Sequence, residues 1–279
     1  MPKPSLTERL RVLNDRRIEN RRLAKPFQRT ADGFLYKGIP IQFSADWEAR
    51  ERRLVHKLLS GADRFVNVGA HYGYFTCLAR SAGVAAIAFE PIDANFHMLL
   101  DNLTQNDFDR GTLLIHAAAG DENAVATITG AFSGATLTAN SRKPASLNQK
   151  TPVVRIDDVV PDIAGQTLFL VDVEGFEYFA LRGAARHVAD CAHNSWIVEI
   201  TGSTINRDGA LVENTDYRAT FEMFLEAGYQ VWSIGPDPMR MDGDALDAAM
   251  RADPRDRPRG NFLFLSQQID IEPLLAAMA

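Results

Sequence analysis

Residues 65–76 read Phe-Val-Asn-Val-Gly-Ala-His-Tyr-Gly-Tyr-Phe-Thr, an apolar strand that runs into a turn of small residues and then into a helix. Gly69 and Gly73 lack a Cβ where the chain must turn sharply, and this lets a ligand approach the backbone. The helix that begins near Tyr74 points its unpaired N–H groups toward the same place. The stretch therefore predicts a cofactor loop on an α/β sheet.

The alternation of strand and helix continues to the end of the chain. We expect seven strands, at residues 64–68, 85–89, 112–117, 167–171, 195–200, 229–234 and 261–266. Helices are expected between them, at residues 74–81, 94–106, 177–188 and 216–227. This alternation favours a doubly wound, mostly parallel sheet with helices on both faces, in which ligands bind at the strand tips.

Additional segments flank and interrupt this pattern. Residues 1–60 are expected to form an extension, with an arginine-rich helix at 5–24, a short hairpin at 34–43 and a helix at 45–60, and residues 61–279 the main domain. An inserted hairpin is expected at 124–138, followed by a polar loop at 139–151. A second irregular loop is expected at 236–260, because it carries four prolines.

The composition limits the range of functions. The net charge of −6 gives no support for nucleic-acid binding, which usually needs a basic surface. Two isolated cysteines, Cys77 and Cys191, make a disulfide framework improbable and fit a reducing compartment. No apolar run is long enough for a membrane span. We therefore expect a cytoplasmic protein with a small-molecule or glycan partner, and the N-terminal helix is the candidate interface of a homodimer.

The second strand ends in a carboxylate. Glu90 follows Phe89 at the strand tip, where it can accept two hydrogen bonds from a ribose diol. A dinucleotide fingerprint would place a second glycine two residues after Gly69, and the chain has His71 there. A sulfonium cofactor has no pyrophosphate and needs only a looser loop. At this point an adenosine-containing cofactor is predicted, and S-adenosylmethionine and NAD(P) both remain open.

Several motifs together resemble the FkbM family of methyltransferases. They are Asn67 to Thr76, Phe89-Glu90-Pro91, Phe132 to Leu137, Arg155 to Asp158, Val171 to Glu177 and Leu181 to Ala184. The resemblance implies a Rossmann-like class I methyltransferase that uses S-adenosylmethionine. It also implies O-methylation of sugars or of hydroxyls on natural products. Two positions depart from the family: Asn67 stands where Asp is usual, and His71 stands where Asn is usual.

The expected cofactor contacts follow from this loop and the neighbouring strand tips. They are Asn67, Val68, Gly69, Ala70, His71, Gly73, Tyr74, Phe75, Thr76, Glu90, Pro91, Asn95, Ala118 and Asp172.

The acidic run after the fourth strand supplies the candidate base. Methyl transfer to a hydroxyl needs removal of its proton, and a carboxylate at a buried strand tip can accept it. Asp172 and Glu174 are the carboxylate candidates, and His71 is the alternative because imidazole titrates near neutral pH.

The acceptor and the rival functions remain open from sequence alone. Substrate contacts are expected from Glu174, Glu199, Thr201 and Arg142, without a metal. The alternatives are an NAD(P)-dependent oxidoreductase, or a non-catalytic binding protein on a degenerate methyltransferase fold.

Overall fold

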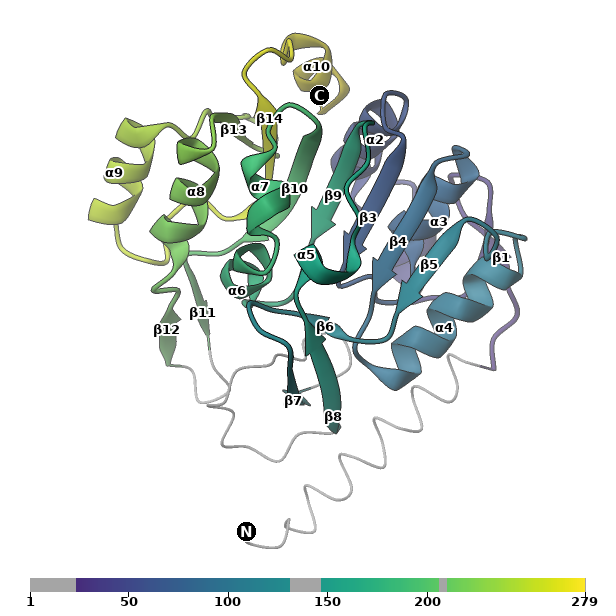
Figure 1. The fold of residues 1–279 in the computed structure, drawn as a ribbon. Helices are drawn as coiled ribbons and strands as arrows, with labels where there is room; N and C mark the ends of the chain where they lie inside the picture. Colours follow the sequence, from purple (N-terminus) through teal and green to yellow (C-terminus); the bar gives the residue numbers. More distant parts are fainter. Residues whose placement is uncertain (1–23, 131–146, 206–209, 279) are drawn as a thin grey trace, which may run out of the picture.

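The computed structural model describes residues 24–130, 147–205 and 210–278, and its centre is a seven-stranded sheet (Figure 1). The strand order is β13-β14-β10-β9-β3-β4-β5, and only β14 runs antiparallel to its neighbours. The strands are β3 (Arg64–Val68), β4 (Ala85–Phe89), β5 (Thr112–Ile115), β9 (Thr167–Val171), β10 (Asn194–Ile200), β13 (Tyr229–Ser233) and β14 (Gly260–Ser266). The mostly parallel, doubly wound sheet predicted from the sequence is confirmed.

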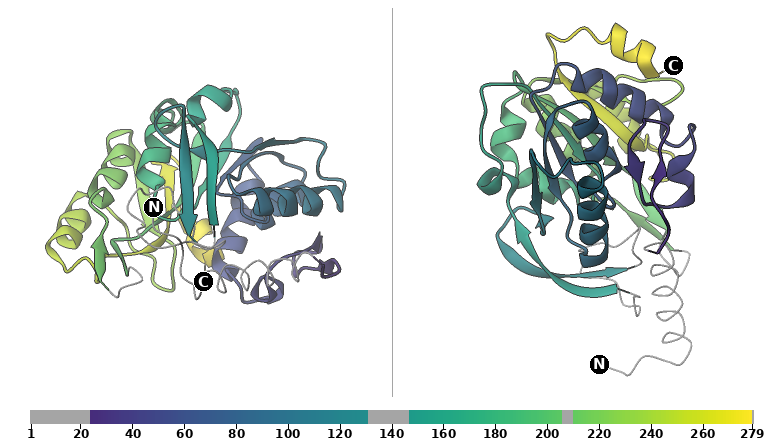
Figure 2. Two further views of the ribbon diagram at one scale, coloured as in Figure 1. Left: turned by 90° about the horizontal axis from the view of Figure 1, so that it is seen from below. Right: turned by 90° about the vertical axis from the view of Figure 1, so that its right-hand side faces the viewer.

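Helices cover both faces of the sheet (Figure 2). One layer holds α2 (Ala49–Leu59), α3 (Tyr74–Ser81), α4 (Asp93–Thr104) and α10 (Glu272–Met278). The other holds α5 (Ile156–Val159), α6 (Glu177–Arg182), α7 (Ala185–Ala189), α8 (Tyr217–Glu226) and α9 (Gly243–Arg251).

Successive side chains of each central strand point to opposite faces of the sheet and pack into two separate hydrophobic cores. Phe65 packs under α2 and α3, whereas Val66 and Val68 pack under the opposite helices. This follows from the two-residue period of a strand. Both faces are apolar because both are covered, and this is why the central strands read as continuous apolar runs in the sequence.

The inserted strands lie at the carboxyl-terminal edge of the sheet. β7 (Ala124–Gly130) pairs antiparallel with β8 (Leu147–Val154), and β6 (Ala118–Ala119) pairs parallel with β8. The expected hairpin thus begins at Ala124, as predicted. Its described partner strand is β8, and residues 147–151 of β8 were expected to belong to the polar loop at 139–151. Residues 131–146, which include Arg142, lie outside the described residues. So does the predicted helix at 5–24, apart from Ala24.

Three local predictions were wrong. Pro40 has no N–H for a strand ladder, so residues 40–43 form a 3₁₀-helix, and the small hairpin pairs β1 (Gln28–Arg29) with β2 (Leu35–Tyr36). The helix expected at 177–188 is instead two helices, α6 and α7. The first ends at Gly183, which lies so close to the Gly120 carbonyl oxygen that a Cβ there would be 1.9 Å from it. The loop expected at 236–260 contains α9, which Asp242 caps by accepting a hydrogen bond from the Ala245 N–H.

The described part of the chain contains a further hairpin, β11 (Ser203–Ile205) with β12 (Leu211–Glu213), beside the same edge. No helix among the described residues is long and apolar enough to cross a membrane.

Candidate active site

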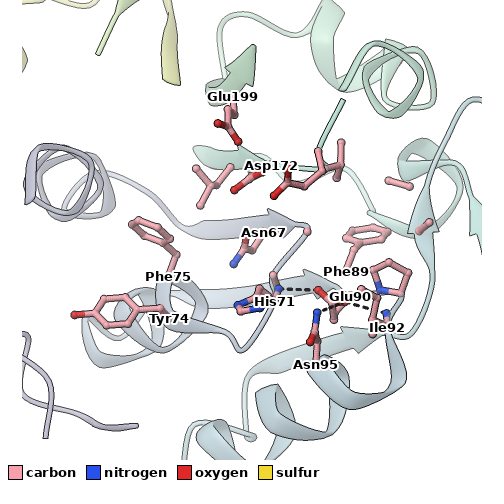
Figure 3. Close-up of a pocket in the computed structure, with 18 of the residues that line it drawn as sticks. Asn67, His71, Tyr74, Phe75, Phe89, Glu90, Ile92, Asn95, Asp172 and Glu199 are labelled. Atoms are coloured by element: carbon pink, nitrogen blue, oxygen red, sulfur yellow. Dashed lines mark hydrogen bonds between the residues drawn. The ribbon is translucent and has the colours of Figure 1, made fainter. Parts of the chain in front are cut away.

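A pocket of about 300 Å³ opens at the carboxyl ends of β3, β4, β9 and β10 (Figure 3). One end is apolar, with Pro91, Ile92, Ala118 and Ile128 around the carboxylate of Glu90. The other end is acidic and lies near the tips of β9 and β10. The loop after β3 lies between these two ends, so the pocket fits the position predicted for a cofactor at the strand tips.

Backbone contacts fix the loop after β3. Gly69 has φ +87°, and a Cβ there would meet the Asp172 carbonyl oxygen at 1.8 Å. The N–H groups of Gly69 and Ala70 both donate to the Phe89 carbonyl, at 3.0 and 2.8 Å. The loop therefore lies against the backbones of β4 and of the segment after β9, and only glycine fits at its first position.

His71 occupies a backbone position that few residue types adopt. Its φ is +52°, in the left-handed region where Asn, Asp and His are enriched among non-glycine residues. The replacement of the usual asparagine by histidine therefore preserves the backbone preference. The imidazole stacks on the Tyr72 ring at a centroid distance of 3.8 Å.

Asn67, the second departure from the family, also has a structural role. Its side chain is 3% exposed, and its Nδ2 donates to the Thr76 hydroxyl at 3.0 Å. This bond joins the end of β3 to the first turn of α3. A neutral amide can donate here, so the loop is held together without a charged side chain at this position.

Glu90 is the central hydrogen-bond acceptor at the apolar end of the pocket. Its Oε2 accepts from the His71 N–H at 2.7 Å, and its Oε1 accepts from the Ile92 N–H at 2.9 Å and from Asn95 Nδ2 at 3.3 Å. Burial raises the pKa of this carboxyl to about 7, although the hydrogen bonds lower it. A carboxylate has about four acceptor positions, so one remains for a ligand hydroxyl.

Asp172 and Glu199 form a carboxyl pair at the acidic end. Both side chains line the pocket. Burial and the negative charge of Glu199 raise the pKa of Asp172 well above its ordinary value.

The other acidic residues of this segment differ in role. Glu177 is 6% exposed, and its Oε1 accepts from the N–H groups of Gly175 at 2.8 Å and Val173 at 3.3 Å. It therefore holds the loop after β9. Glu174 lines the pocket with a left-handed backbone, φ +54°. Burial and the charge of Glu199 raise its pKa.

Most residues named from the sequence line this pocket. They are Asn67, Gly69, Ala70, His71, Tyr74, Phe75, Glu90, Pro91, Asn95, Ala118, Asp172, Glu174 and Glu199. Val68, Gly73, Thr76 and Thr201 do not line it. Val68 is a core residue, and Gly73 instead lets the Leu99 side chain approach, because a Cβ there would lie 2.2 Å from Leu99 Cδ1.

Sequence reasoning missed one wall of the pocket. Tyr36, Ile39, Gln42, Trp47, Glu48 and Glu51 line it from the segment before β3, and Asn261 lines it from β14. No local motif marks these residues, because their approach to the pocket depends on how the segment packs on α3. Among the described residues, no group of three or more His, Cys, Asp or Glu side chains could hold a metal ion.

The sheet is doubly wound with this strand order, and the pocket has an acidic residue, Glu90, after the second core strand. Together these features define a Rossmann-like, class I methyltransferase architecture. The model of the FkbM methyltransferase domain matches residues 67–231, which is more than half of the chain. The chain belongs to this family and is an S-adenosylmethionine-dependent methyltransferase.

Solved structures with a similar chain trace include two methyltransferases. An O-methyltransferase from Bacillus cereus, solved in complex with SAH, is 9% identical, with a TM-score of 0.41 over 95% of this chain and 92% of that chain. The precorrin-6y C5,15-methyltransferase from Geobacter metallireducens is 13% identical, with a TM-score of 0.41 over 79% and 87%. No curated protein matches the chain.

The pocket fits S-adenosylmethionine in size and chemistry. The small apolar side chains of Pro91, Ile92 and Ala118 suit an adenine ring, and Glu90 retains an acceptor position for a ribose hydroxyl. The methionine part would then extend past Ala70 and His71 toward Asp172.

Proposed function

We propose that this methyltransferase acts on a hydroxyl of a sugar or secondary metabolite, with Asp172 as the base. The observation that carries the proposal is that Asp172 and Glu199 both line the pocket at the strand tips, where burial and the charge of Glu199 raise the pKa of Asp172. A base with a pKa moved toward neutrality accepts a hydroxyl proton more readily than an ordinary carboxylate does.

The chain's residues would align and deprotonate the acceptor. The bound cofactor supplies an electrophilic methyl group on a positively charged sulfur. As the acceptor oxygen forms its bond to that carbon and the carbon–sulfur bond breaks, Asp172 takes the hydroxyl proton. The sulfur keeps the bonding electron pair, so charge and atoms balance. A cationic group in the pocket also favours the ionised form of Asp172, which prepares the base.

His71 and Glu174 are weaker candidates for this role. The His71 ring is stacked on Tyr72, and its backbone N–H is bonded to Glu90 at the adenosine side of the loop. Glu174 lines the same acidic end from the left-handed turn after Asp172, where it is suited to contact the acceptor.

The non-catalytic alternative loses its main support. It was motivated by the departures at Asn67 and His71. Both residues have local structural explanations, in the bond to Thr76 and in the positive φ.

Turnover of wild-type protein and Asp172→Asn, measured as S-adenosylhomocysteine formed with a panel of polyhydroxylated acceptors, tests the proposal. General-base loss should lower kcat by about 10²–10⁴-fold. The affinity for S-adenosylhomocysteine should change by less than about threefold, or about 0.7 kcal/mol. The exposed Asp109→Asn is the matched control. Wild-type kcat in Asp172→Asn would reject Asp172 as the base, and methylation of nitrogen acceptors alone would reject the hydroxyl.

A further inference from the structure

The wall that the segment from Tyr36 to Glu51 adds to the pocket lies outside residues 67–231, the part that matches the family model. It meets the acidic end of the pocket, and Trp47 packs against two rings of α3. The ring centroids of Trp47 and Tyr74 are 4.7 Å apart, and those of Trp47 and Phe75 are 6.0 Å apart. This wall therefore faces the place where an acceptor would lie.

Tyr36 brings an unsatisfied hydroxyl to this wall. The residue is 0% exposed and lines the pocket, and its hydroxyl makes no hydrogen bond of good geometry. The Gln42 side chain lies beside it, and Gln42 Oε1 accepts from the Ile39 N–H at 2.9 Å. A buried hydroxyl without a good partner is costly in free energy, so a polar ligand group that pairs with it would be favoured.

Glu48 is held in the pocket by a strained backbone. Its φ is 43° and its ψ is 40°, a left-handed conformation that is costly for a residue with a Cβ. Arg52 maintains the turn, because its Nη1 donates to the carbonyls of Ala45 at 3.0 Å and Trp47 at 3.2 Å. Its Nε bonds to Asp32 Oδ2 at 2.8 Å. Strain that the surroundings maintain in this way is typical of functional positions.

The acidic end of the pocket holds more carboxyl groups than the positive charge of the cofactor can neutralise. Five carboxyl side chains line it: Glu48, Glu51, Asp172, Glu174 and Glu199. Among the described residues, no Lys or Arg lines the pocket. S-adenosylmethionine carries one net positive charge, which leaves several carboxyls uncompensated. Aromatic rings beside carboxylates attract organic cations through the negative face of the ring.

We propose that Tyr36, Trp47, Glu48 and Glu51 form an acceptor subsite for a positively charged group. The methyl acceptor is then a hydroxyl compound that also carries an amine or quaternary ammonium. This inference rests on the proposed transfer to a hydroxyl and names the class of acceptor. The ring of Trp47 and the two carboxylates hold the cation.

Choline and 3,3-dimethylbutan-1-ol test the subsite, because they have nearly the same shape and hydroxyl position and differ in charge. Calorimetry with wild-type protein saturated with S-adenosylhomocysteine should give at least about tenfold tighter binding of choline. Glu48→Gln and Glu51→Gln should each remove most of this preference and leave the affinity for the neutral alcohol unchanged. Glu272→Gln, an exposed site in α10 at the end of the sheet opposite the pocket, should behave as wild type.

Equal affinities of wild-type protein for the two probes would overturn the proposal, and so would an unchanged choline preference in both variants. Thermal melting and S-adenosylhomocysteine affinity identify variants that do not fold. Should Glu48→Gln be such a variant, Glu51→Gln alone decides the result. Because the readout is binding, it is independent of the Asp172 turnover test: a choline preference without hydroxyl methylation would overturn the proposed reaction and keep the cation subsite.

Discussion

Gly69 and His71 show how single backbone positions select residue types in the cofactor loop. Both have positive φ, +87° and +52°, within three residues of chain. Glycine is required at the first because the Asp172 carbonyl oxygen fills the place of a Cβ. Histidine is tolerated at the second because it belongs to the few side chains that visit this region. Backbone geometry therefore constrains this loop as strongly as ligand contact does.

Gly69→Ala should therefore disrupt the loop. The strain of a non-glycine residue at this φ costs about 1–3 kcal/mol, and the new Cβ must also displace the Asp172 backbone. We expect S-adenosylhomocysteine affinity at least about tenfold weaker, equivalent to about 1.4 kcal/mol, by calorimetry. Gly61→Ala is the control, since its nearest neighbour to an added Cβ is 4.0 Å away. Wild-type affinity in Gly69→Ala would show that the loop relaxes freely.

Glu90→Gln should weaken cofactor binding although it preserves the shape of the side chain. An amide group would turn a donor toward the N–H of either His71 or Ile92, which both donate to Glu90. Hydrogen bonds to charged groups contribute about 1.5–3 kcal/mol each, so a loss of at least about tenfold in S-adenosylhomocysteine affinity follows. Calorimetry at pH 8, with Glu272→Gln as control, measures it. An unchanged affinity would mean that Glu90 neither orders the loop nor contacts the ribose.

At the scale of elements, one buried carboxylate joins the turn between β1 and β2 to α2 and α3. Asp32 accepts from Arg52 Nε at 2.8 Å, from the Tyr74 hydroxyl at 2.7 Å and from His56 at 3.2 Å. These hydrogen bonds hold the pKa of Asp32 well below its ordinary value, although burial opposes them. The segment that carries Glu48 is thus fastened to the helix that follows the cofactor loop.

Asp32→Ala should release this segment. The Asp32 and Arg52 side chains are each 9% exposed, and removing one partner of a buried ion pair leaves the other charge uncompensated, at a cost of about 3–5 kcal/mol. Urea unfolding should report this loss, and S-adenosylhomocysteine binding should weaken because Tyr74 also loses a partner. Asp253→Ala removes an exposed ion pair with Arg255, and should change stability by less than about 1 kcal/mol. Similar effects of the two variants would refute the fastening role of Asp32.

The elements that the sequence predicted well are those with strong local signals. The strands β3, β4 and β9 are continuous apolar runs bounded by turn residues, and their observed bounds are those predicted. The close approach of Gly183 to the Gly120 carbonyl, 63 residues away in the chain, is a long-range contact, and so is the packing of the N-terminal pocket wall against α3. Such long-range contacts produce no periodic pattern in the sequence. Local patterns therefore located the part of the site at the strand tips and missed the N-terminal pocket wall.

At the scale of the whole molecule, the chain encloses an unusual amount of negative charge around one pocket. Burial raises the pKa of Glu48, Glu90 and Glu177 to about 7 in each case. For Glu48 the charges of Glu51 and Glu199 add to the effect, and Arg52 opposes it. Ionisation of these carboxyls therefore lowers the folding stability of the protein without ligand. A cationic cofactor or acceptor offsets this effect.

Stability without ligand should consequently fall as the pH rises toward 8. A carboxyl with a raised pKa binds its proton more tightly in the folded state, so its contribution is complete below the unfolded value near 4.5 and is lost as the pH rises through about 7. His187, with a lowered pKa due to burial, acts in the opposite direction below its usual value. With three such carboxyls against one histidine, the urea midpoint should be higher at about pH 6 than at about pH 8. Glu48→Gln should reduce the dependence of the urea midpoint on pH, whereas the exposed Glu272→Gln should not. A urea midpoint that does not change with pH in the wild-type protein would show that these carboxyls ionise at ordinary pKa values.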